Sequence, residues 1–464
     1  MTIMDTEVIV VGFGISGLTA ALSALDAGAR VVVLEKGTKN NARGFDCGAV
    51  NSSVHKEAGV IIDRDALIGE LMVQSNYRAD QRLFTVWTDK SGEMIDWLRG
   101  LVEPRGIQAF LPEHRVNNQG PYKVWQTAVN WTGQNAGLAK EMEALIVEKG
   151  GEIHYKTPAV QLMREPEGRV TGVIARQPDG SLLHVNAKKG VILSCGGYDD
   201  NPEMMEKYLR PADLRVARHN SETGGCVGDG HTMALAVGAA MDEAPHCLIV
   251  GNGIIEDEKH TEFYLVMFTP YLRVDCNGER FVNEDSDYCR SANAGSRLPK
   301  GFHWSILDST KEESRWGDKV ALLEQYVPEG AVLKAETLEE LAKKMDVPAE
   351  TLGATIYRYN SLAAGGKDLD FGVEVAKMRP ILVAPYYAMR VHNFCLVTVS
   401  GLTINTNMQV IDTDGKVIPG LYASGNTSGG FFVDAYPRNV HGASHGRAMT
   451  FGRLAALHAV SRSA

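Results

Sequence analysis

Seven cysteines are few for a chain of 464 residues, and their spacing excludes several kinds of site. They stand at positions 47, 195, 226, 247, 276, 289 and 395, and no two of them form a C-x-x-C pair. Scattered thiols of this kind are typical of a reduced, cytoplasmic chain, and they disfavour a disulfide framework, a zinc or iron–sulfur site and a c-type haem. We therefore expect no bound metal.

Positive charge and uninterrupted apolar runs are also scarce. The 47 Lys and Arg residues stand against 57 Asp and Glu, and the net charge of −10 argues against nucleic acid or an anionic membrane as the main partner. The start of the chain is acidic, and the first apolar run carries three patterned glycines, so neither a secretory peptide nor a transmembrane helix fits it. We expect a cytoplasmic protein without stable membrane insertion.

Glycine, in contrast, is abundant and patterned. The β-branched run Val8–Val11 precedes a G-x-G-x-x-G sequence formed by Gly12, Gly14 and Gly17, a helical stretch, and a second strand that ends at Glu35. In such a βαβ unit the first glycine makes the tight turn, the second lets the backbone approach a pyrophosphate, and the third allows close helix–strand packing. The helix N-terminus attracts phosphates, and Glu35 would accept hydrogen bonds from an adenosine ribose. The unit predicts a dinucleotide site.

Helices and strands alternate through most of the remaining chain. At roughly 150 residues per domain, the length predicts about two or three packed units. Composition changes between about 245 and 375, and this interrupted pattern indicates one nucleotide-binding domain at 1–243 and 376–464, with a second domain inserted at 244–375. We expect helices over 61–102 (a pair), 134–149, 334–365 and 443–462, and strands over 152–163, 169–176, 182–187, 190–195 and 400–425.

Several motifs along the chain resemble the fumarate reductase / 3-ketosteroid dehydrogenase flavoprotein superfamily, in the order that this family shows. The resemblance implies an α/β fold, with a Rossmann-like FAD-binding domain of the GR2 type and an inserted α+β capping domain that closes over the isoalloxazine. The motifs are Lys36-Gly37, Gly190–Gly197, Gly228–Gly230, Asn277–Glu284, Gly401–Asn405, Gln409–Asp412, Ile418–Asn426 and Ala448–Arg453.

The resemblance also implies FAD as cofactor. Members with covalent FAD use a histidine in the early glycine-rich loop, and the corresponding stretch Arg43–Ala49 has none, so non-covalent FAD is expected. The helix that begins after Gly442 would place the positive end of its dipole at the flavin N1/O2 edge, or would serve only in packing. The residues implied in cofactor binding are Gly12, Gly14, Ile15, Ser16, Gly17, Glu35, Lys36, Gly44, Val160, Gly196, Gly197, Asp229, Gly425, Asn426 and Ser444.

Tyrosines favour the ketosteroid dehydrogenase branch of this family. Tyr288 stands where fumarate reductases carry a proton-delivering arginine, and Leu396-Val397 replaces a substrate-binding histidine. In the ketosteroid branch, residues at the positions of Tyr436 and Gly442 hold the ketone oxygen through a hydroxyl and an N–H group. A tyrosine at the position of Tyr288 moves the proton while flavin N5 handles the hydride.

Three points stay open at this stage. A third tyrosine from the first domain would be Tyr122, or alternatively Tyr77. Arg438 and His441 lie in a loop that is longer than in the ketosteroid branch, and they would contact substrate or a phosphate of a nicotinamide donor, or else be solvated loop residues. Arg290, after a small shift in register, would supply the arginine of a fumarate-type site.

Together these features predict an FAD-dependent enzyme that acts on CH–CH bonds. It would transfer hydride between flavin N5 and the carbon β to the carbonyl of a hydrophobic, uncharged cyclic ketone or enone, steroid-like or phenolic, as a dehydrogenase or an ene-reductase. An external donor or acceptor, NAD(P)H, a quinone or a redox protein, would exchange the electrons. The alternatives are a fumarate- or urocanate-type reductase of a small unsaturated carboxylate, an amino-acid oxidase, and a non-catalytic flavin electron-transfer subunit.

Overall fold

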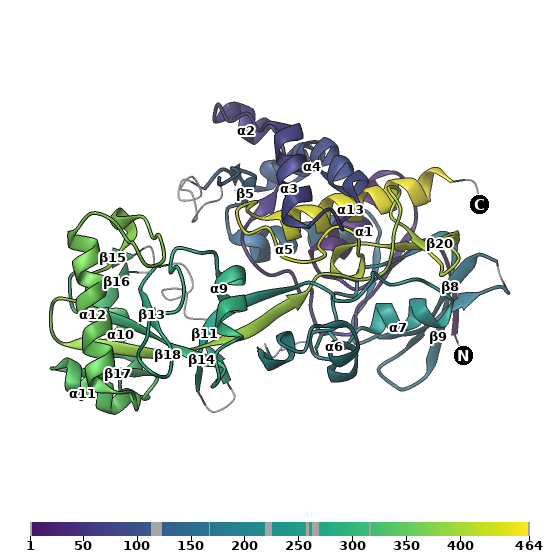
Figure 1. The fold of residues 1–464 in the computed structure, drawn as a ribbon. Coiled ribbons are helices and arrows are strands. Elements are labelled where there is room, and N and C mark those ends of the chain that lie inside the picture. Colours follow the sequence, from purple (N-terminus) through teal and green to yellow (C-terminus); the bar gives the residue numbers. More distant parts are fainter. Residues whose placement is uncertain are drawn as a thin grey trace.

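A predominantly parallel sheet organises the first of two lobes in the computed structural model, which describes residues 2–112, 123–166, 168–218, 225–256, 259–261, 269–314 and 317–462 (Figure 1). Its strands follow the order β19-β20-β9-β1-β2-β6, and β8 and β7 continue from β9. The bounds are β1 (Thr2–Val11), β2 (Val31–Leu34), β6 (Glu152–His154), β7 (Ala159–Arg164), β8 (Val170–Arg176), β9 (Leu182–Leu193), β19 (Gln409–Ile411) and β20 (Val417–Ala423).

The predicted βαβ unit is the centre of this sheet. Strand β1 pairs in parallel with β2 and with β9, and Val8, Ile9 and Val10 have no exposed surface. Helix α1 (Ile15–Asp26) connects β1 to β2 and packs against the long C-terminal helix α13 (Ala443–Ser461). Full burial on both faces explains why these strands read as continuous apolar runs.

Three strand predictions were wrong in their bounds. The strands expected over 182–187 and 190–195 form the single strand β9, because a bulge opposite Thr6 and Val8 absorbs the polar pair Lys188-Lys189. The strand expected over 152–163 is two strands, β6 and β7. Pro158 follows the first of them, and proline cannot donate to a strand ladder.

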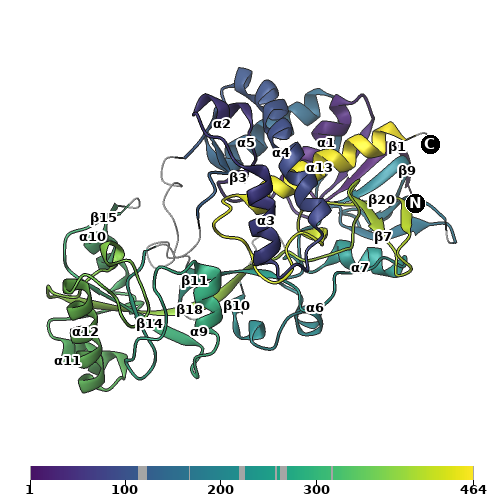
Figure 2. The same cartoon turned by 45° about the horizontal axis from the view of Figure 1, so that its top comes forward.

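Helices cover the first sheet and extend the lobe. The expected pair over 61–102 is confirmed as α3 and α4, and the helix expected over 134–149 is α5. Figures 1 and 2 show α1, α4, α5 and α13 grouped together on the first lobe. The elements here are α2 (Ser53–Glu57), α3 (Arg64–Gln74), α4 (Gln81–Val102), α5 (Gln134–Glu148), α6 (Pro202–Tyr208), α7 (Asp229–Ala236), β3 (Cys47–Gly48), β4 (Ala109–Phe110), β5 (Ala128–Trp131) and the 3₁₀ helices η1 (Glu103–Arg105), η3 (Asp213–Arg215) and η5 (Gly425–Thr427).

A second, mainly antiparallel sheet builds the other lobe, which lies apart from the first in both views (Figures 1 and 2). Its strand order is β12-β11-β18-β14-β13, and β10 and β17 also pair with β18. The elements are β10 (Ala217–Arg218), β11 (Leu248–Glu256), β12 (Lys259–Thr261), β13 (Leu272–Val274), α9 (Tyr288–Gly295), β14 (Phe302–Asp308), β15 (Glu313–Ser314), β16 (Gly317–Asp318), α10 (Lys319–Tyr326), β17 (Val332–Ala335), α11 (Leu338–Met345), α12 (Ala349–Ala364), η4 (Val375–Lys377) and β18 (Tyr386–Thr398).

The long strand β18 extends from this lobe toward the first sheet. The predicted domain boundaries at 244 and 375 stay a prediction. The helical stretch expected over 334–365 is interrupted. Asp346 takes a left-handed conformation (φ 57°) after α11, and Pro348 precedes α12, so that two helices replace one.

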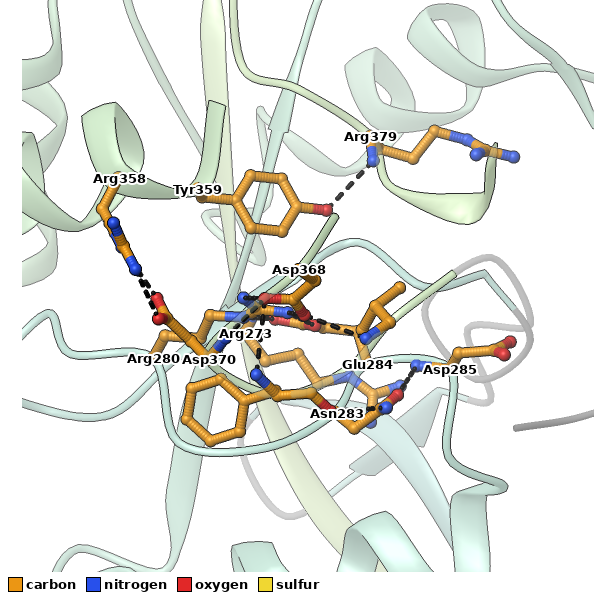
Figure 3. A network of polar contacts seen from close by, with 12 residues as sticks. Arg273, Arg280, Asn283, Glu284, Asp285, Arg358, Tyr359, Asp368, Asp370 and Arg379 are labelled. Carbon is orange, nitrogen blue, oxygen red and sulfur yellow. Dashed lines mark hydrogen bonds and ion pairs between the residues drawn. The ribbon is translucent and has the colours of Figure 1, made fainter. Parts of the chain in front are cut away.

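A buried ion-pair network explains one of the motifs. The Arg280 guanidinium donates to both oxygens of Glu284 (2.8 and 2.7 Å) and of Asp368 (3.0 and 2.8 Å), and it lies between the rings of Tyr359 and Phe371 (Figure 3). The Arg280 side chain is 6% exposed, and both carboxylates are fully buried. The arginine and the last glutamate of Asn277–Glu284 therefore hold the second lobe together.

None of the helices within the described ranges is long and apolar enough to cross a membrane.

Candidate functional site

A cavity of about 520 Å³ opens where β1, β2 and β9 end. The carboxyl ends of parallel strands meet at one edge of a sheet, and ligands of open α/β sheets bind there. The predicted residues that line this cavity are Gly12, Gly14, Ile15, Ser16, Glu35, Lys36, Gly44, Gly196, Asp229, Gly425, Asn426, Tyr436, Gly442 and Ser444.

Five of the predicted residues are not part of this wall. Gly17 and Gly197 pack behind it, and Val160, which is 40% exposed, follows the lining residue Ala159. Tyr122 lies outside the described residues. Of Tyr288 the structure describes the backbone, at the first position of α9. The roles of all these residues stay predictions.

The three glycines of the opening turn have different surroundings. A Cβ on Gly12 would lie 2.4 Å from the Ser194 carbonyl oxygen, and one on Gly17 would lie 2.0 Å from the Gly12 oxygen, so close packing requires both. The nearest atom to a Cβ on Gly14 would be the Asn41 oxygen at 3.7 Å. Space beside Gly14, next to the N-terminus of α1, is what the approach of a pyrophosphate to the backbone needs.

Glu35 braces this turn. Its two carboxylate oxygens accept from the Phe13 N–H (2.7 Å) and the Gly37 N–H (2.6 Å), and the residue is 7% exposed. A carboxylate offers about four lone-pair positions, so acceptor capacity is left for ribose hydroxyls.

Lys36 and Asp229 form an ion pair at the cavity wall. The Lys36 ammonium donates to Asp229 (2.8 Å) and to the Gly225 carbonyl (2.6 Å). The pair joins the end of β2 to the start of α7. The two charges compensate each other, and the two hydrogen bonds fix the position of the Lys36 ammonium.

Serine hydroxyls join the ends of three elements in a way that sequence reading missed. The Ser424 hydroxyl lies 2.8 Å from that of Ser16 and 2.9 Å from that of Ser194. Ser194 and Ser424 each directly follow a buried strand, β9 and β20, and this position at a strand end was the available signal.

Tyr436 lines the part of the wall that comes from the C-terminal segment. It is 7% exposed, and its hydroxyl oxygen accepts from the Ser444 N–H at 3.3 Å. Burial raises the pKa of Tyr436 to about 12, while the Ser444 hydrogen bond and the charge of Arg438 act in the opposite direction. The phenol thus stays protonated at neutral pH, and its O–H group is a donor rather than a base.

The Gly442 N–H lies at the N-cap of α13, where the residue has a φ of 74°. Within the described part of the chain this N–H forms no hydrogen bond, whereas the Gly442 carbonyl accepts from Gly48 N at 2.8 Å. Tyr436 and Gly442 together therefore offer an O–H and an N–H donor at the wall of one cavity.

Arg438 and His441 are buried, at 6% and 1% exposure, so the interpretation of both as solvated loop residues was wrong. The loop between Pro437 and Gly442 folds inward, and Arg438 lines the cavity. Leu396 and Val397, the apolar pair that replaces a fumarate-type histidine, line it as well.

His445 is a cavity residue that the sequence analysis did not single out. Its Nδ1 lies 3.1 Å from the Asp46 carbonyl, and a Cβ on Gly44 would lie 2.3 Å from its Cε1, so the early loop is shaped around this ring. Burial lowers the pKa of His445, which favours the neutral imidazole. Because a carbonyl only accepts, Nδ1 carries the proton in this arrangement.

These features fit FAD. The opening turn leaves space beside Gly14 at a helix N-terminus, Glu35 retains acceptor capacity next to it, and donors from α13 lie at the wall of the same cavity. A dinucleotide needs this combination of phosphate, ribose and ring-system contacts along one continuous space.

Comparison with known proteins agrees with this assignment. The model of the family described as FAD binding domain matches residues 7–439. A vinyl phenol reductase of Lactiplantibacillus plantarum is 30% identical, over 98% of this chain and 96% of its own.

Two solved structures share the fold, which confirms the predicted fold class. The 3-ketosteroid Δ1-dehydrogenase of Sterolibacterium denitrificans, in complex with 1,4-androstadiene-3,17-dione, has a TM-score of 0.82 at 21% identity and covers 98% of this chain and 99% of that one. The open conformation of a flavocytochrome c3 fumarate reductase has a TM-score of 0.75 at 25% identity, covering 98% of this chain and 78% of that one.

Proposed function

The chain belongs to the FAD binding domain family and is an FAD-dependent oxidoreductase of CH–CH bonds, and we propose that it acts on an alkene conjugated with a phenol or ketone oxygen. Such a substrate is an uncharged, hydrophobic cyclic compound, phenolic or steroid-like. The vinyl phenol reductase, which matches this chain over almost its whole length, supports the reductive direction.

The arrangement around Tyr436 carries this proposal. Its protonated hydroxyl is held by the Ser444 N–H, and Gly442, whose N–H forms no hydrogen bond with the described residues, lines the same cavity. When hydride adds to the carbon β to a ketone, negative charge develops on the ketone oxygen, and the same holds when hydride adds to the quinone-methide tautomer of a vinyl phenol. Two fixed donors in a site shielded from water stabilise this charge, and removing one such donor typically costs about 10²- to 10³-fold in rate.

Bound FAD supplies two-electron hydride chemistry at flavin N5. The chain's own part is to hold the substrate oxygen through Tyr436 and Gly442 and to exclude water with the apolar side chains Leu396 and Val397. We further propose that Tyr288, at the start of α9, moves the proton, and that an external donor such as NAD(P)H, a quinone or a redox protein delivers the electrons.

A small unsaturated carboxylate is the second candidate substrate, because Arg438 is buried at the cavity wall beside Tyr436. A guanidinium is suited to a carboxylate, which it binds through two parallel hydrogen bonds. The same guanidinium also stabilises the oxyanion of a phenolate or enolate. Arg438 alone therefore does not distinguish the two candidates, whereas only the phenol or ketone substrate needs the Tyr436 hydroxyl.

Stopped-flow measurements on the dithionite-reduced holoenzyme test the proposal. We expect vinyl phenol or a cyclic enone to reoxidise the flavin faster than fumarate or urocanate does. Tyr436→Phe should lower this rate by about 10²- to 10³-fold while flavin content is kept. Tyr422→Phe is the matched control, because Tyr422 is also a buried tyrosine with a bonded hydroxyl (3.0 Å to His458) but does not line the cavity.

Two results would contradict the proposal. Full activity of Tyr436→Phe with every phenol and enone would remove the oxygen-holding role. Faster turnover of fumarate or urocanate, abolished in Arg438→Met and unchanged in Tyr436→Phe, would favour the carboxylate reductase instead.

A further inference from the structure

Arg447 is a fully buried arginine on α13, one turn beyond the cavity-lining residues at the start of that helix. Its Nη1 donates to the Ser428 carbonyl and its Nη2 to the Asn426 side-chain oxygen, both at 3.1 Å. The guanidinium lies over the ring of Phe432, 4.8 Å from the centroid. Both hydrogen bonds hold the turn 425–428, of which Gly425 and Asn426 line the cavity.

The contact with Arg447 fixes the orientation of the Asn426 carboxamide. A guanidinium has only donors, so the amide must present its oxygen to it, and the NH₂ group takes the opposite position. This Asn426 NH₂ group forms no hydrogen bond with the described residues, although the residue belongs to the cavity wall. The carboxamide therefore offers N–H donors on the side away from Arg447.

Stability alone does not account for a charge in this place. Burial lowers the pKa of Arg447 to about 10, and its Nε has no partner among the described residues. Asp242 provides a compensating charge, but its carboxylate is also engaged by the N–H groups of Gly401 (3.2 Å) and Gly430 (3.0 Å). Replacing a whole buried ion pair by apolar side chains of similar volume is often neutral or stabilising, whereas removing one partner alone is destabilising.

We propose that Arg447 is a positioning residue for the cofactor: through Asn426 Oδ1 it fixes the carboxamide so that Asn426 Nδ2 donates a hydrogen bond to bound FAD. The inference rests on the predicted contact of Asn426 with FAD and not on the identity of the substrate. Without Arg447 the amide rotates freely, and its oxygen faces the cofactor for part of the time. The N–H donor is then lost for that fraction.

The coupling between Arg447 and Asn426 in FAD affinity separates this role from a purely structural one. We expect Arg447→Met to weaken FAD binding, measured by titration of the apoprotein, about 2-fold, because the freed amide presents its N–H donor for about half of the time. The urea midpoint of the Arg447→Met apoprotein should fall, because the Asp242 carboxylate loses its compensating charge and the Ser428 carbonyl loses its donor. Asn426→Leu should weaken FAD roughly 5- to 10-fold, the value of one hydrogen bond. The double variant should bind FAD no more weakly than Asn426→Leu alone, since both changes act on the same bond.

Two further variants complete the design. Asn426→Asp keeps the acceptor for Arg447 but lacks the N–H donor, so it should also lose FAD affinity without loss of apoprotein stability. Arg453→Met is the matched control, because Arg453 lies on the same helix against Trp97, 4.0 Å from the ring centroid, and it does not line the cavity.

Three outcomes would overturn the inference. If Asn426→Leu leaves FAD affinity unchanged, the contact with the cofactor is absent. If Asn426→Leu weakens FAD but Arg447→Met does not, the positioning role is absent. If the losses of the two single variants multiply in the double variant, the residues act independently.

Discussion

Glu35 offers the sharpest test of the cofactor end of the cavity, since its two oxygens have separate tasks. In Glu35→Ala the buried N–H groups of Phe13 and Gly37 both lose their acceptor, at about 1–3 kcal/mol each. In Glu35→Gln one oxygen remains, and the new NH₂ group faces one of these two donors. We therefore expect the free energy of unfolding of the apoprotein to fall by about 1–3 kcal/mol in the glutamine variant, and by more in the alanine variant.

FAD affinity should change independently of this loss. A hydrogen bond to a charged acceptor contributes about 1.5–3 kcal/mol, so losing the ribose contact weakens FAD roughly 10- to 150-fold. Urea unfolding of the apoprotein and calorimetric titration with FAD measure the two effects separately. Glu152→Gln, an exposed change on the neighbouring strand β6, is the control. A destabilised Glu35→Gln apoprotein that binds FAD with unchanged affinity would refute the ribose role and leave Glu35 as a brace of the turn.

Two further predictions concern the interior. Arg280→Met leaves the buried carboxylates of Glu284 and Asp368 without their cation, so it should lower the free energy of unfolding, measured in urea, by about 3–5 kcal/mol. Arg358→Met, at a more exposed ion pair of the same region, should change this free energy little. Equal effects of the two variants would contradict the network in Figure 3. Burial raises the pKa of Asp242 to about 6 from 3.8, so the native chain holds this proton more tightly than the unfolded chain. The stability that this proton contributes is complete below about pH 4 and is lost as the pH rises through 6. Asp242→Asn should therefore reduce the pH dependence of the apoprotein's free energy of unfolding in this range. An unchanged slope would mean that another group titrates there.

Local patterns predicted the first lobe because its sequence signals and its packing agree. Gly12 and Gly17 of the opening turn are required because any Cβ there would lie 2.0–2.4 Å from a backbone oxygen, and steric demands of this kind leave a fixed spacing in the sequence. The long buried strands were equally readable from their apolar runs. The predicted strand bounds were wrong where a bulge at Lys188-Lys189 or a proline changed the pairing. Such changes depend on the partner strand, which lies far away in the chain, so the local sequence does not show them.

The cavity wall was harder to predict, since its side chains meet only in three dimensions. His445 and Gly44 are 401 positions apart in the numbering, and nothing local to either residue indicates that the loop is shaped around the imidazole. Arg447 lies within the helix predicted over 443–462, and nothing in the sequence singled it out, because a buried cation gives no periodic signal. Arg438 and His441 look like loop residues by composition, and only the inward course of the loop buries them.

Different parts of the chain form the two ends of the cavity, and this separation helps to explain how one fold serves several substrates. The cofactor end is built from strand ends and the opening turn, where close contacts tolerate little change. The proposed substrate end is formed by Tyr436, Arg438 and Gly442, which lie in the loop before α13 and line the cavity. A loop changes its length and side chains at little cost to a packed sheet. Substrate choice can thus shift within these few residues while flavin binding stays the same, so variants of Tyr436 and Arg438 should alter the preferred substrate without changing FAD content.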